Sequence, residues 1–331
     1  MNIRVIGGGW YGCSLALALS EAGHEVEVHE SGTRLFNGAS GANPGRLHKG
    51  FHYPRSRLTR AACLDHAEAF MARYGHLTRT IPANLYCVAS EDSYLDFGTY
   101  CQVLKGEVDF VTLERPSDLG LRNIEGAVLT GERHICVDLS REWFTAKIGH
   151  LVKLETPAGD LNDPQWDWTI DCTFCALDAE AIDRYEPCVT TLVKGPTDRA
   201  VTIMDGPFPS LYPWKEEAGL SSLTSAKLTP LSKTCRTYDE AQAMLLAVSA
   251  DELVARTQAM MDQIGFYWPD VHDLFEVVDL RTAVRAMPKS GADARLVDVI
   301  SVGDRALRVR AGKIDAVFRA EALILERMGL A

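Results

Sequence analysis

Glycines near the start of the chain are spaced for binding a diphosphate. Gly7, Gly9 and Gly12 form the pattern G-x-G-x-x-G directly after the apolar run at residues 3–6. In this pattern the first glycine permits a tight turn, the second lets the backbone approach a pyrophosphate, and the third lets a helix pack closely on a strand. The following helix, with Trp10 and Tyr11 at its start, directs free backbone N–H groups at the phosphates. These residues predict a dinucleotide site.

An acidic residue stands where the ribose of a dinucleotide would be bound. Glu30 ends the strand pattern of residues 26–30 and lies 18 residues after Gly12. A carboxylate at this place hydrogen-bonds a ribose hydroxyl group. FAD and NAD both carry this ribose, so Glu30 does not separate them. The alternative is a glycine-rich turn in another kind of α/β protein, which the surrounding strand, helix and acid disfavour.

The next segment reverses the sign of charge in an otherwise acidic chain. Residues 38–45 read G-A-S-G-A-N-P-G. Basic side chains follow at Arg46, His48, Lys49, His52, Arg55, Arg57 and Arg60. This local concentration of positive charge predicts an anionic neighbour.

Hydrophobic periodicity predicts the elements that position these residues. Helices are expected at 58–74, from Ser140 as N-cap to about 151, at 238–264 with a break near 250, and at 314–328. Strands are expected within 83–115, at 168–171, within 189–229, at 273–286 and at 297–302.

The order of these elements predicts an α/β fold with a Rossmann-type, discontinuous nucleotide-binding domain and an inserted, mainly antiparallel β-sheet substrate domain. We assign residues 1–80, 130–185 and 295–331 to the first domain, and residues 81–129 and 186–294 to the second. Ligand sites form preferentially between two such domains.

Composition narrows the class of protein. The chain has 331 residues and a net charge of −11, which disfavours nucleic acid and anionic membranes as partners. No apolar run approaches a membrane span, and the first strand leaves no room for a signal peptide, so we expect a cytoplasmic protein. The nine scattered cysteines predict buried thiols and no metal site. Cys172 and Cys175 form a C-x-x-C, for which packing at a strand end is favoured over a redox dithiol.

Several segments together resemble the FAD-dependent oxidoreductases of the D-amino-acid oxidase and glycine oxidase type. The glycine pattern with its acid is one, and the small-residue stretch from Ala39 to Gly45 is another. His48, Gly50 and Tyr53 match an H-x-G-x-x-Y pattern of the branch that contains L-2-hydroxyglutarate oxidases. Near the end, residues 311–315 (A-G-K-I-D) are similar to the family's glycine loop before a helix that points at the flavin.

The resemblance implies FAD as the cofactor. It also assigns the strand end at Cys172 and Thr173 to the cofactor, although Phe174 stands where the family has glycine and puts close approach there in doubt. The residues expected to bind FAD are Gly7, Gly9, Trp10, Tyr11, Gly12, Glu30, Ala39, Ser40, Asn43, Gly45, Arg46, Leu47, Cys172, Thr173, Gly312, Lys313 and Ile314. A helix N-terminus near Gly312, with the charge of Lys313, would stabilise reduced flavin.

The family reaction implies hydride transfer to flavin N5 from a C–H bond beside an amine or hydroxyl group. The substrate is expected to be a small amine, amino acid or 2-hydroxy acid, with a carboxylate clamped by Arg281 or Arg285. Arg46 and Arg55 are alternatives for this clamp. His48 is the candidate base, with packing beside the flavin or covalent attachment to it as alternatives, and Tyr53 is expected in the cleft.

Two rival functions stay open on the sequence. An NAD(P)-dependent dehydrogenase uses the same glycine pattern. A subunit that keeps the FAD-binding fold without turnover is suggested by Phe174 and by a shortened segment between residues 148 and 168. The substrate, the electron acceptor and the oligomeric state, with room for a homo-oligomer, are not determined by the sequence.

Overall fold

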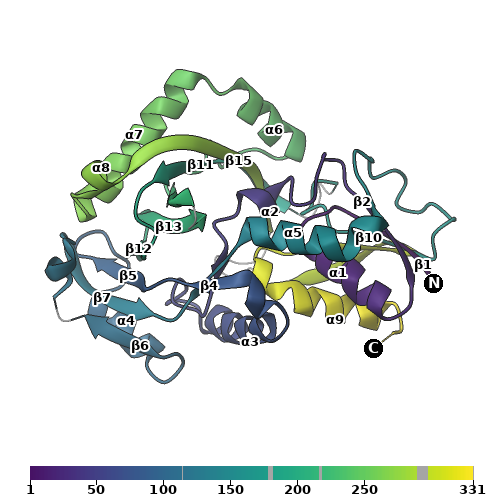
Figure 1. Ribbon diagram of the computed structural model, residues 1–331, viewed down its shortest axis with the longest axis horizontal. Helices are drawn as coiled ribbons and strands as arrows, with labels where there is room; N and C mark the ends of the chain where they lie inside the picture. The colour runs from purple at the N-terminus through teal and green to yellow at the C-terminus, as the bar shows by residue number, and fades with distance from the viewer. Residues whose placement is uncertain (114, 178–181, 216–217, 289–296, 331) are drawn as a thin grey trace.

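The computed structural model describes residues 1–113, 115–177, 182–215, 218–288 and 297–330. The described residues form two large β-sheets and one small sheet of three strands (Figure 1). The predicted α/β fold class is confirmed.

The six-stranded sheet carries the N-terminus of the chain. Its strand order is β16-β17-β10-β1-β2-β9, and all neighbours are parallel except β16 and β17. Parallel strands need crossovers, and helices supply most of them here. The strands are β1 (Asn2–Ile6), β2 (Glu25–His29), β9 (Val152–Lys153), β10 (Trp168–Asp171), β16 (Asp298–Gly303) and β17 (Ala306–Arg310).

Helices α1 (Trp10–Glu21), α3 (Arg57–Tyr74), α5 (Val137–Ile148) and α9 (Val317–Arg327) pack around this sheet, with α1 against both α5 and α9. Trp10 is buried among aromatic rings at the start of α1, with ring centroids 5.3 Å from Phe36 and 5.4 Å from Phe144. This packing anchors the helix that follows the glycine turn.

The eight-stranded sheet has the order β15-β11-β14-β13-β12-β5-β7-β6 and is antiparallel except between β12 and β5. Helices α6 (Tyr238–Ala247), α7 (Ala250–Tyr267) and α8 (Val271–Leu274) lie along its outer side in Figure 1. Its strands are β5 (Ala83–Ala89), β6 (Phe110–Leu113), β7 (Ile124–Thr130), β11 (Ile182–Lys194), β12 (Arg199–Met204), β13 (Pro209–Lys215), β14 (Leu220–Ser225) and β15 (Glu276–Pro288).

A three-stranded sheet of β3 (Arg46–Leu47), β8 (Arg133–Ile135) and β4 (Thr78–Thr80) links the two large sheets along the chain. The first large sheet draws on residues 2–29, 152–171 and 298–310, and the second on residues 83–130 and 182–288. Strand β11 therefore already begins inside the segment 130–185 that the sequence assigned to the first domain. The exact domain boundaries stay a prediction.

Two local predictions were wrong. Ser140 does not cap α5: the helix begins at Val137, and the Ser140 hydroxyl donates to the carbonyl of Cys136 at 2.7 Å. Serine in the second turn of a helix often makes this backward bond. In the region 83–115, where only strands and turns were expected, residues Phe97–Leu104 form helix α4. Asp96 caps this helix by accepting a hydrogen bond from the Thr99 N–H at 2.8 Å.

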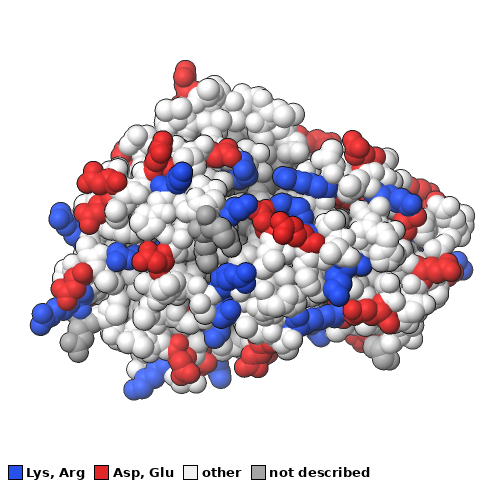
Figure 2. Space-filling view, in the orientation of Figure 1, with Lys and Arg blue, Asp and Glu red and all other residues white. Residues whose placement is uncertain are grey.

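The surface charge, the helices, the metal-binding residue types and the cysteines each bear on whether the protein has what special sites require. Basic and acidic side chains are interspersed over the face shown in Figure 2. Among the described residues, no helix is both long and apolar enough to cross a membrane, and no group of three or more His, Cys, Asp or Glu side chains is placed to hold a metal ion. Among the described residues, which include all nine cysteines, no disulfide bond forms.

Candidate active site and cofactor cradle

The glycine turn between β1 and α1 has the close contacts that only glycine permits. A Cβ atom on Gly12 would lie 1.9 Å from the carbonyl oxygen of Gly7. Gly7 has a φ of +102°, and a Cβ there would lie 2.9 Å from the carbonyl oxygen of Cys172. The turn thus brings the start of α1 close to the ends of β1 and β10, where the backbone can meet a diphosphate.

Ser40 closes over the N-terminus of α1. Its hydroxyl group accepts a hydrogen bond from the Trp10 N–H at 3.0 Å, and a Cβ on Gly9 would lie 2.8 Å from the same oxygen. The side chain of Trp10 is buried in the core, so this residue can offer a cofactor only its backbone. Gly9, Trp10 and Ser40 therefore form one polar cradle from segments thirty residues apart.

Glu30 lies at the end of β2 and supports the turn directly. Its Oε2 atom accepts from the Gly8 N–H at 2.7 Å, and its Oε1 atom accepts from the Gly32 N–H at 2.6 Å. A carboxylate has lone pairs for further donors. The structure places Glu30 beside the diphosphate cradle, and its bond to the ribose stays a prediction.

Only some residues of the stretch from Ala39 to Leu47 line the cavity that is described below. Ala39, Asn43 and Arg46 line that cavity. Gly45 has a φ of +68°, with the Asn43 side chain accepting from its N–H at 2.8 Å. The Leu47 side chain is fully buried in the hydrophobic core, so only its backbone is available to a cofactor.

The C-terminal loop is tied to the glycine turn. The Tyr11 hydroxyl donates a hydrogen bond to the carbonyl of Lys313. The Lys313 ammonium group lies 3.1 Å from the Cys63 sulfur and 4.1 Å from the centre of the Tyr53 ring. Burial lowers the pKa of Lys313, but Tyr53, Cys63 and Asp315 together outweigh it and hold the pKa above its ordinary value. Lys313 is therefore a half-buried cation.

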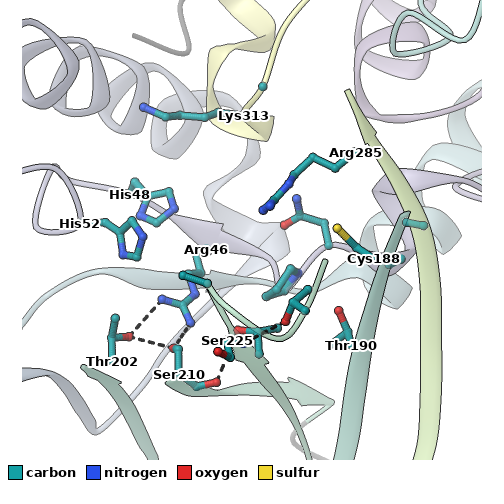
Figure 3. A pocket seen from close by; sticks show the side chains of 18 of the residues that line it. Arg46, His48, His52, Cys188, Thr190, Thr202, Ser210, Ser225, Arg285 and Lys313 are labelled. Carbon is teal, nitrogen blue, oxygen red and sulfur yellow. Dashed lines mark hydrogen bonds between the residues drawn. The ribbon is translucent and has the colours of Figure 1, made fainter. Parts of the chain in front are cut away.

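A cavity of about 400 Å³ lies where these segments face the eight-stranded sheet. Gly312, Lys313, Ile314 and Asp315 line one part of it, and His48, His52 and Tyr53 line another (Figure 3). The sheet and the turn after β14 contribute small polar side chains to the wall: Cys188, Thr190, Thr202, Ser210, Thr224 and Ser225 from strands, and Thr229 from the turn.

Arg46 contacts the sheet wall of the cavity. Its guanidinium group donates to the Thr202 hydroxyl at 3.0 Å and to the Ser210 hydroxyl, and it lies 4.4 Å from the centre of the Tyr212 ring (Figure 3). These partners are neutral, so among the described residues no carboxylate forms an ion pair with Arg46. The structure places this residue on the substrate-domain wall, and its assignment to FAD stays a prediction.

The two predicted clamp arginines have different surroundings. Arg285 lines the cavity, and its Nε and Nη2 atoms both donate to Oε2 of Glu186, with the Nε distance 3.0 Å. Arg281 lies four residues along β15, is exposed, and pairs with Asp279 at 2.5 Å. The structure thus brings Arg285 but not Arg281 to the site. Arg55, the other alternative, pairs with the cavity residue Asp205 at 2.6 Å.

Glu186 holds two guanidinium groups at once. Its carboxylate is buried and also accepts from Arg184 Nε at 2.8 Å. Burial raises the pKa of Glu186, but Arg285 and Arg184 outweigh it and keep the pKa below its ordinary value. Because Arg184 also pairs with Asp183 at 2.7 Å, these four side chains form an ion-pair network whose formal charges balance.

The predicted base lies beside a buried acid. His48 Nδ1 lies 3.9 Å from Oε1 of Glu132, and the His48 ring centroid is 5.6 Å from His52 and 5.5 Å from Tyr53. Glu132, between β7 and β8, accepts from the Tyr86 hydroxyl and the Lys49 N–H, each at 2.6 Å. Burial raises the pKa of Glu132 to about 7 despite these bonds.

The end of β10 is buried against the glycine turn. The Thr173 N–H and hydroxyl both donate to Asp171, and Arg308 fixes that carboxylate at 2.6 Å. Burial raises the pKa of the Cys172 thiol, which opposes thiolate formation. Phe174 has a φ of +58°, the left-handed conformation that glycine adopts without strain, and it lines the cavity.

Comparisons with known proteins agree with this geometry. The family model described as FAD dependent oxidoreductase matches residues 2–138. The FAD-dependent monooxygenase FPY4 of Fusarium mangiferae is 34% identical over 98% of this chain and 90% of its own. The chain belongs to the FAD-dependent oxidoreductase family. Its cofactor is FAD, which sets aside the NAD(P)-dependent alternative, and it is an oxidoreductase rather than a subunit without turnover.

Other relatives of this FAD-dependent oxidoreductase support the same fold. The FAD-dependent monooxygenase kojA of Aspergillus flavus is 26% identical over 97% of this chain and 84% of its own. A glycine oxidase from Geobacillus kaustophilus superposes with a TM-score of 0.70 at 16% identity, covering 98% of this chain and 93% of its own. An FAD-bound L-alpha-glycerophosphate oxidase from Mycoplasma pneumoniae gives 0.74 at 14% identity, covering 98% and 94%. The finer likeness to L-2-hydroxyglutarate oxidases stays a prediction.

The residues present fit FAD. The turn at Gly7–Gly12 has no room for side chains at its close contacts, and α1 offers N–H groups to a diphosphate. Asn43 and Gly312 line the cavity together with residues of the eight-stranded sheet, which leaves space for the flavin between the loops and the sheet. Bound FAD supplies the acceptor for a hydride.

Sequence reasoning missed three buried carboxylates at this site: Glu132, Glu186 and Asp315. Glu132 and Glu186 lie far along the chain from the motifs and reach the site only through strand pairing. Asp315 was inside the matched stretch at residues 311–315, and an acid among small and apolar residues was the one available signal.

Proposed function

We propose that this oxidoreductase oxidises a small, carboxylate-bearing substrate at a C–H bond that adjoins a hydroxyl or amine group. The observation that carries the proposal is Arg285, which lines the cavity and is oriented by the buried Glu186. Its Nε and Nη2 atoms are taken by Glu186, which leaves the Nη1 edge for a substrate oxygen. Guanidinium groups are well suited to carboxylates.

Other cations strengthen the case for an anionic substrate. Arg46 and Lys313 line the same cavity, and each lies over an aromatic ring. Figure 3 shows Arg285 and the two histidines on different sides of the cavity that they line, and we expect a substrate to bind between them. The polar sheet wall supplies hydroxyl groups for its other polar atoms.

His48 is the group placed to take a proton from a hydroxyl substrate. A histidine titrates near neutral pH, as an efficient base requires. Glu132 lies 3.9 Å from its Nδ1 atom and can stabilise the protonated ring. As the substrate O–H bond gives its proton to His48, the C–H hydrogen leaves with both electrons and the carbon–oxygen single bond becomes a double bond. An amine substrate in its neutral form does not need this base.

Anaerobic reduction of the bound flavin tests the proposal. The holoprotein is mixed under argon with a panel of 2-hydroxy acids and amino acids, and the flavin absorbance is followed. Matched amides and decarboxylated amines or alcohols serve as controls. We expect bleaching by acids and at least tenfold weaker apparent binding of the analogues that lack the carboxylate, because a charge-assisted hydrogen bond contributes about 1.5–3 kcal/mol. Preferential bleaching by the analogues without a carboxylate would overturn the proposal.

A second candidate function is monooxygenation, which the names of the two fungal relatives favour. It is distinguished by the fate of oxygen. An oxidation of the proposed kind reduces the flavin without oxygen and leaves no atom of O₂ in the product. A monooxygenase incorporates one labelled oxygen atom from O₂ and consumes two electrons from a reductant.

A further inference from the structure

The carboxylate of Asp315 is buried without a hydrogen-bond partner from the protein. Asp315 is 1% exposed, and among the described residues neither its Oδ1 nor its Oδ2 atom has a hydrogen-bond partner. Buried polar groups are almost always hydrogen-bonded, and a carboxylate is among the costliest to leave without a partner. Asp315 also lines the cavity, so a bound molecule can reach it.

Tyr11 and Lys313, which interact electrostatically with Asp315, both have other partners. The Tyr11 hydroxyl donates to the carbonyl of Lys313. The Lys313 ammonium group contacts the Cys63 sulfur and the Tyr53 ring, and it acts on Asp315 through charge rather than through a hydrogen bond. Neither of these two side chains donates a hydrogen bond to the Asp315 carboxylate.

The position of Asp315 in the fold limits which molecule supplies the missing donor. It lies in the short turn Ile314–Ala316, directly before α9, next to the loop at Gly312 and Lys313. The diphosphate cradle at Gly7–Gly12 takes the middle of FAD, so the half that extends into the cavity beside Gly312 is the flavin half. This half carries O–H donors on its ribityl chain and an N–H donor at ring position N3.

We propose that Asp315 is an FAD-binding residue whose carboxylate accepts a hydrogen bond from the flavin half of the cofactor, at a ribityl hydroxyl group or at N3–H. An ionised carboxylate only accepts hydrogen bonds, which matches both of these donors. FAD would supply this carboxylate with a donor that the described protein groups do not provide. This inference rests on the cofactor and is independent of the proposed substrate.

Affinity and stability of the apoprotein test the inference without any measurement of turnover. In Asp315→Leu we expect FAD to bind about 10- to 100-fold more weakly, because an interaction with a charged acceptor is lost. ADP, which lacks the flavin half, is expected to bind within twofold of wild type. The melting temperature of the apoprotein is expected to rise, because the unsatisfied carboxylate is gone.

A conservative variant and a surface control keep the test falsifiable. Asp315→Asn retains one acceptor and is expected to lie between wild type and Asp315→Leu in FAD affinity. Asp304→Asn, at an exposed position, is expected to change neither FAD affinity nor melting temperature. Unchanged FAD affinity in both Asp315 variants overturns the inference, and so does an equal loss of FAD and ADP binding.

Modified cofactors then identify the donor. FAD analogues that each lack one ribityl hydroxyl group, and FAD methylated at N3, are titrated into wild type and Asp315→Leu. The analogue that removes the true donor loses affinity in wild type but not in the variant, which is the non-additivity expected of two groups in contact. If every analogue loses the same factor in both proteins, Asp315 does not contact the flavin half. Strengthened FAD binding at high concentrations of an amine substrate, with no analogue effect, assigns Asp315 to the substrate instead.

Discussion

Two arginines four residues apart on β15 differ in their partners, and substitution of each tests what that difference does. Arg285 lines the cavity and is oriented by Glu186, whereas Arg281 pairs with the exposed Asp279. In Arg285→Met we expect the apparent affinity for a carboxylate substrate to fall about 10- to 100-fold, because a charge-assisted hydrogen bond is removed. Stopped-flow reduction of the flavin at several substrate concentrations measures this.

The matched control is Arg281→Met, on the same face of the same strand. Its effect is expected to stay within twofold, since surface ion pairs contribute little. A larger effect of Arg281→Met than of Arg285→Met would mean that the clamp has been assigned to the wrong arginine. Comparable, small effects in both would remove the carboxylate clamp from the proposed function altogether.

The residues that sequence reasoning did not find share a physical reason. Motifs are found when chemistry depends on neighbours in the chain, as with Gly7, Gly9 and Gly12. Glu132 and Glu186 act on His48 and Arg285 across 84 and 99 positions of sequence, and only the folded sheets bring them together. A buried carboxylate at such a distance has no local signature. Arg281 was predicted as readily as Arg285 because spacing alone does not show which one faces the cavity.

At the scale of elements, the turn from β1 to α1 is the most constrained part of the cofactor site. In Gly12→Ala the new Cβ would lie 1.9 Å from the Gly7 carbonyl oxygen, so α1 must move away from the turn. We expect the purified variant to lose most of its FAD and to melt at a lower temperature. Absorbance of the bound flavin and thermal unfolding measure the two effects.

Gly149 provides the matched control for that substitution. It ends α5 with a φ of −55°, and a Cβ there meets its nearest atom at 3.7 Å, an ordinary contact. Gly149→Ala is expected to retain FAD and to be as stable as wild type or slightly more stable, by about 0.4–1 kcal/mol. If Gly12→Ala keeps its flavin as well as Gly149→Ala does, the close contact in the turn is not what the cofactor requires.

Elements with a strong local signal were predicted well and elements decided by context were not. The long helix at 58–74 and the break near residue 250 were predicted from periodicity, and α3, α6 and α7 confirm them. The structure adds that Ser249 caps α7. Helix α4 lies in a region read as strands because its short, apolar sequence suits either state, and Asp96 decides the outcome. Short apolar runs are ambiguous by periodicity alone.

At the scale of the whole molecule, the cavity exists only because segments that are distant in the chain meet. Its lining comes from the eight-stranded sheet and from loops beside it, within residues 39–53, 174, 188–210, 224–229, 283–287 and 312–315. The discontinuous arrangement was readable from nucleotide-domain signals at both ends of the chain. The shape and charge of the cavity were not, because they depend on the packing of one sheet against the other's loops.

The buried carboxylate of Glu132, beside the cavity residue His48, makes the stability of the whole apoprotein depend on pH. Burial raises the pKa of Glu132 to about 7 in the folded protein, while an unfolded glutamate titrates at about 4.3. The folded state therefore keeps a proton that the unfolded state loses between these values. This contribution to stability is full at low pH and is lost as the pH rises through about 7.

The neutral variant Glu132→Gln isolates this contribution, because other titrating groups such as Asp315, His66 and His134 act in both proteins and largely cancel. Between pH 5 and pH 8, the free energy of unfolding of wild type is expected to fall relative to the variant by about 2–3 kcal/mol. Urea unfolding of the two apoproteins at several pH values measures the difference. Parallel pH profiles would show that Glu132 titrates normally in the folded state. His48 would then lie beside an ordinary carboxylate, ionised throughout the neutral range, rather than beside one that gains its charge only near pH 7.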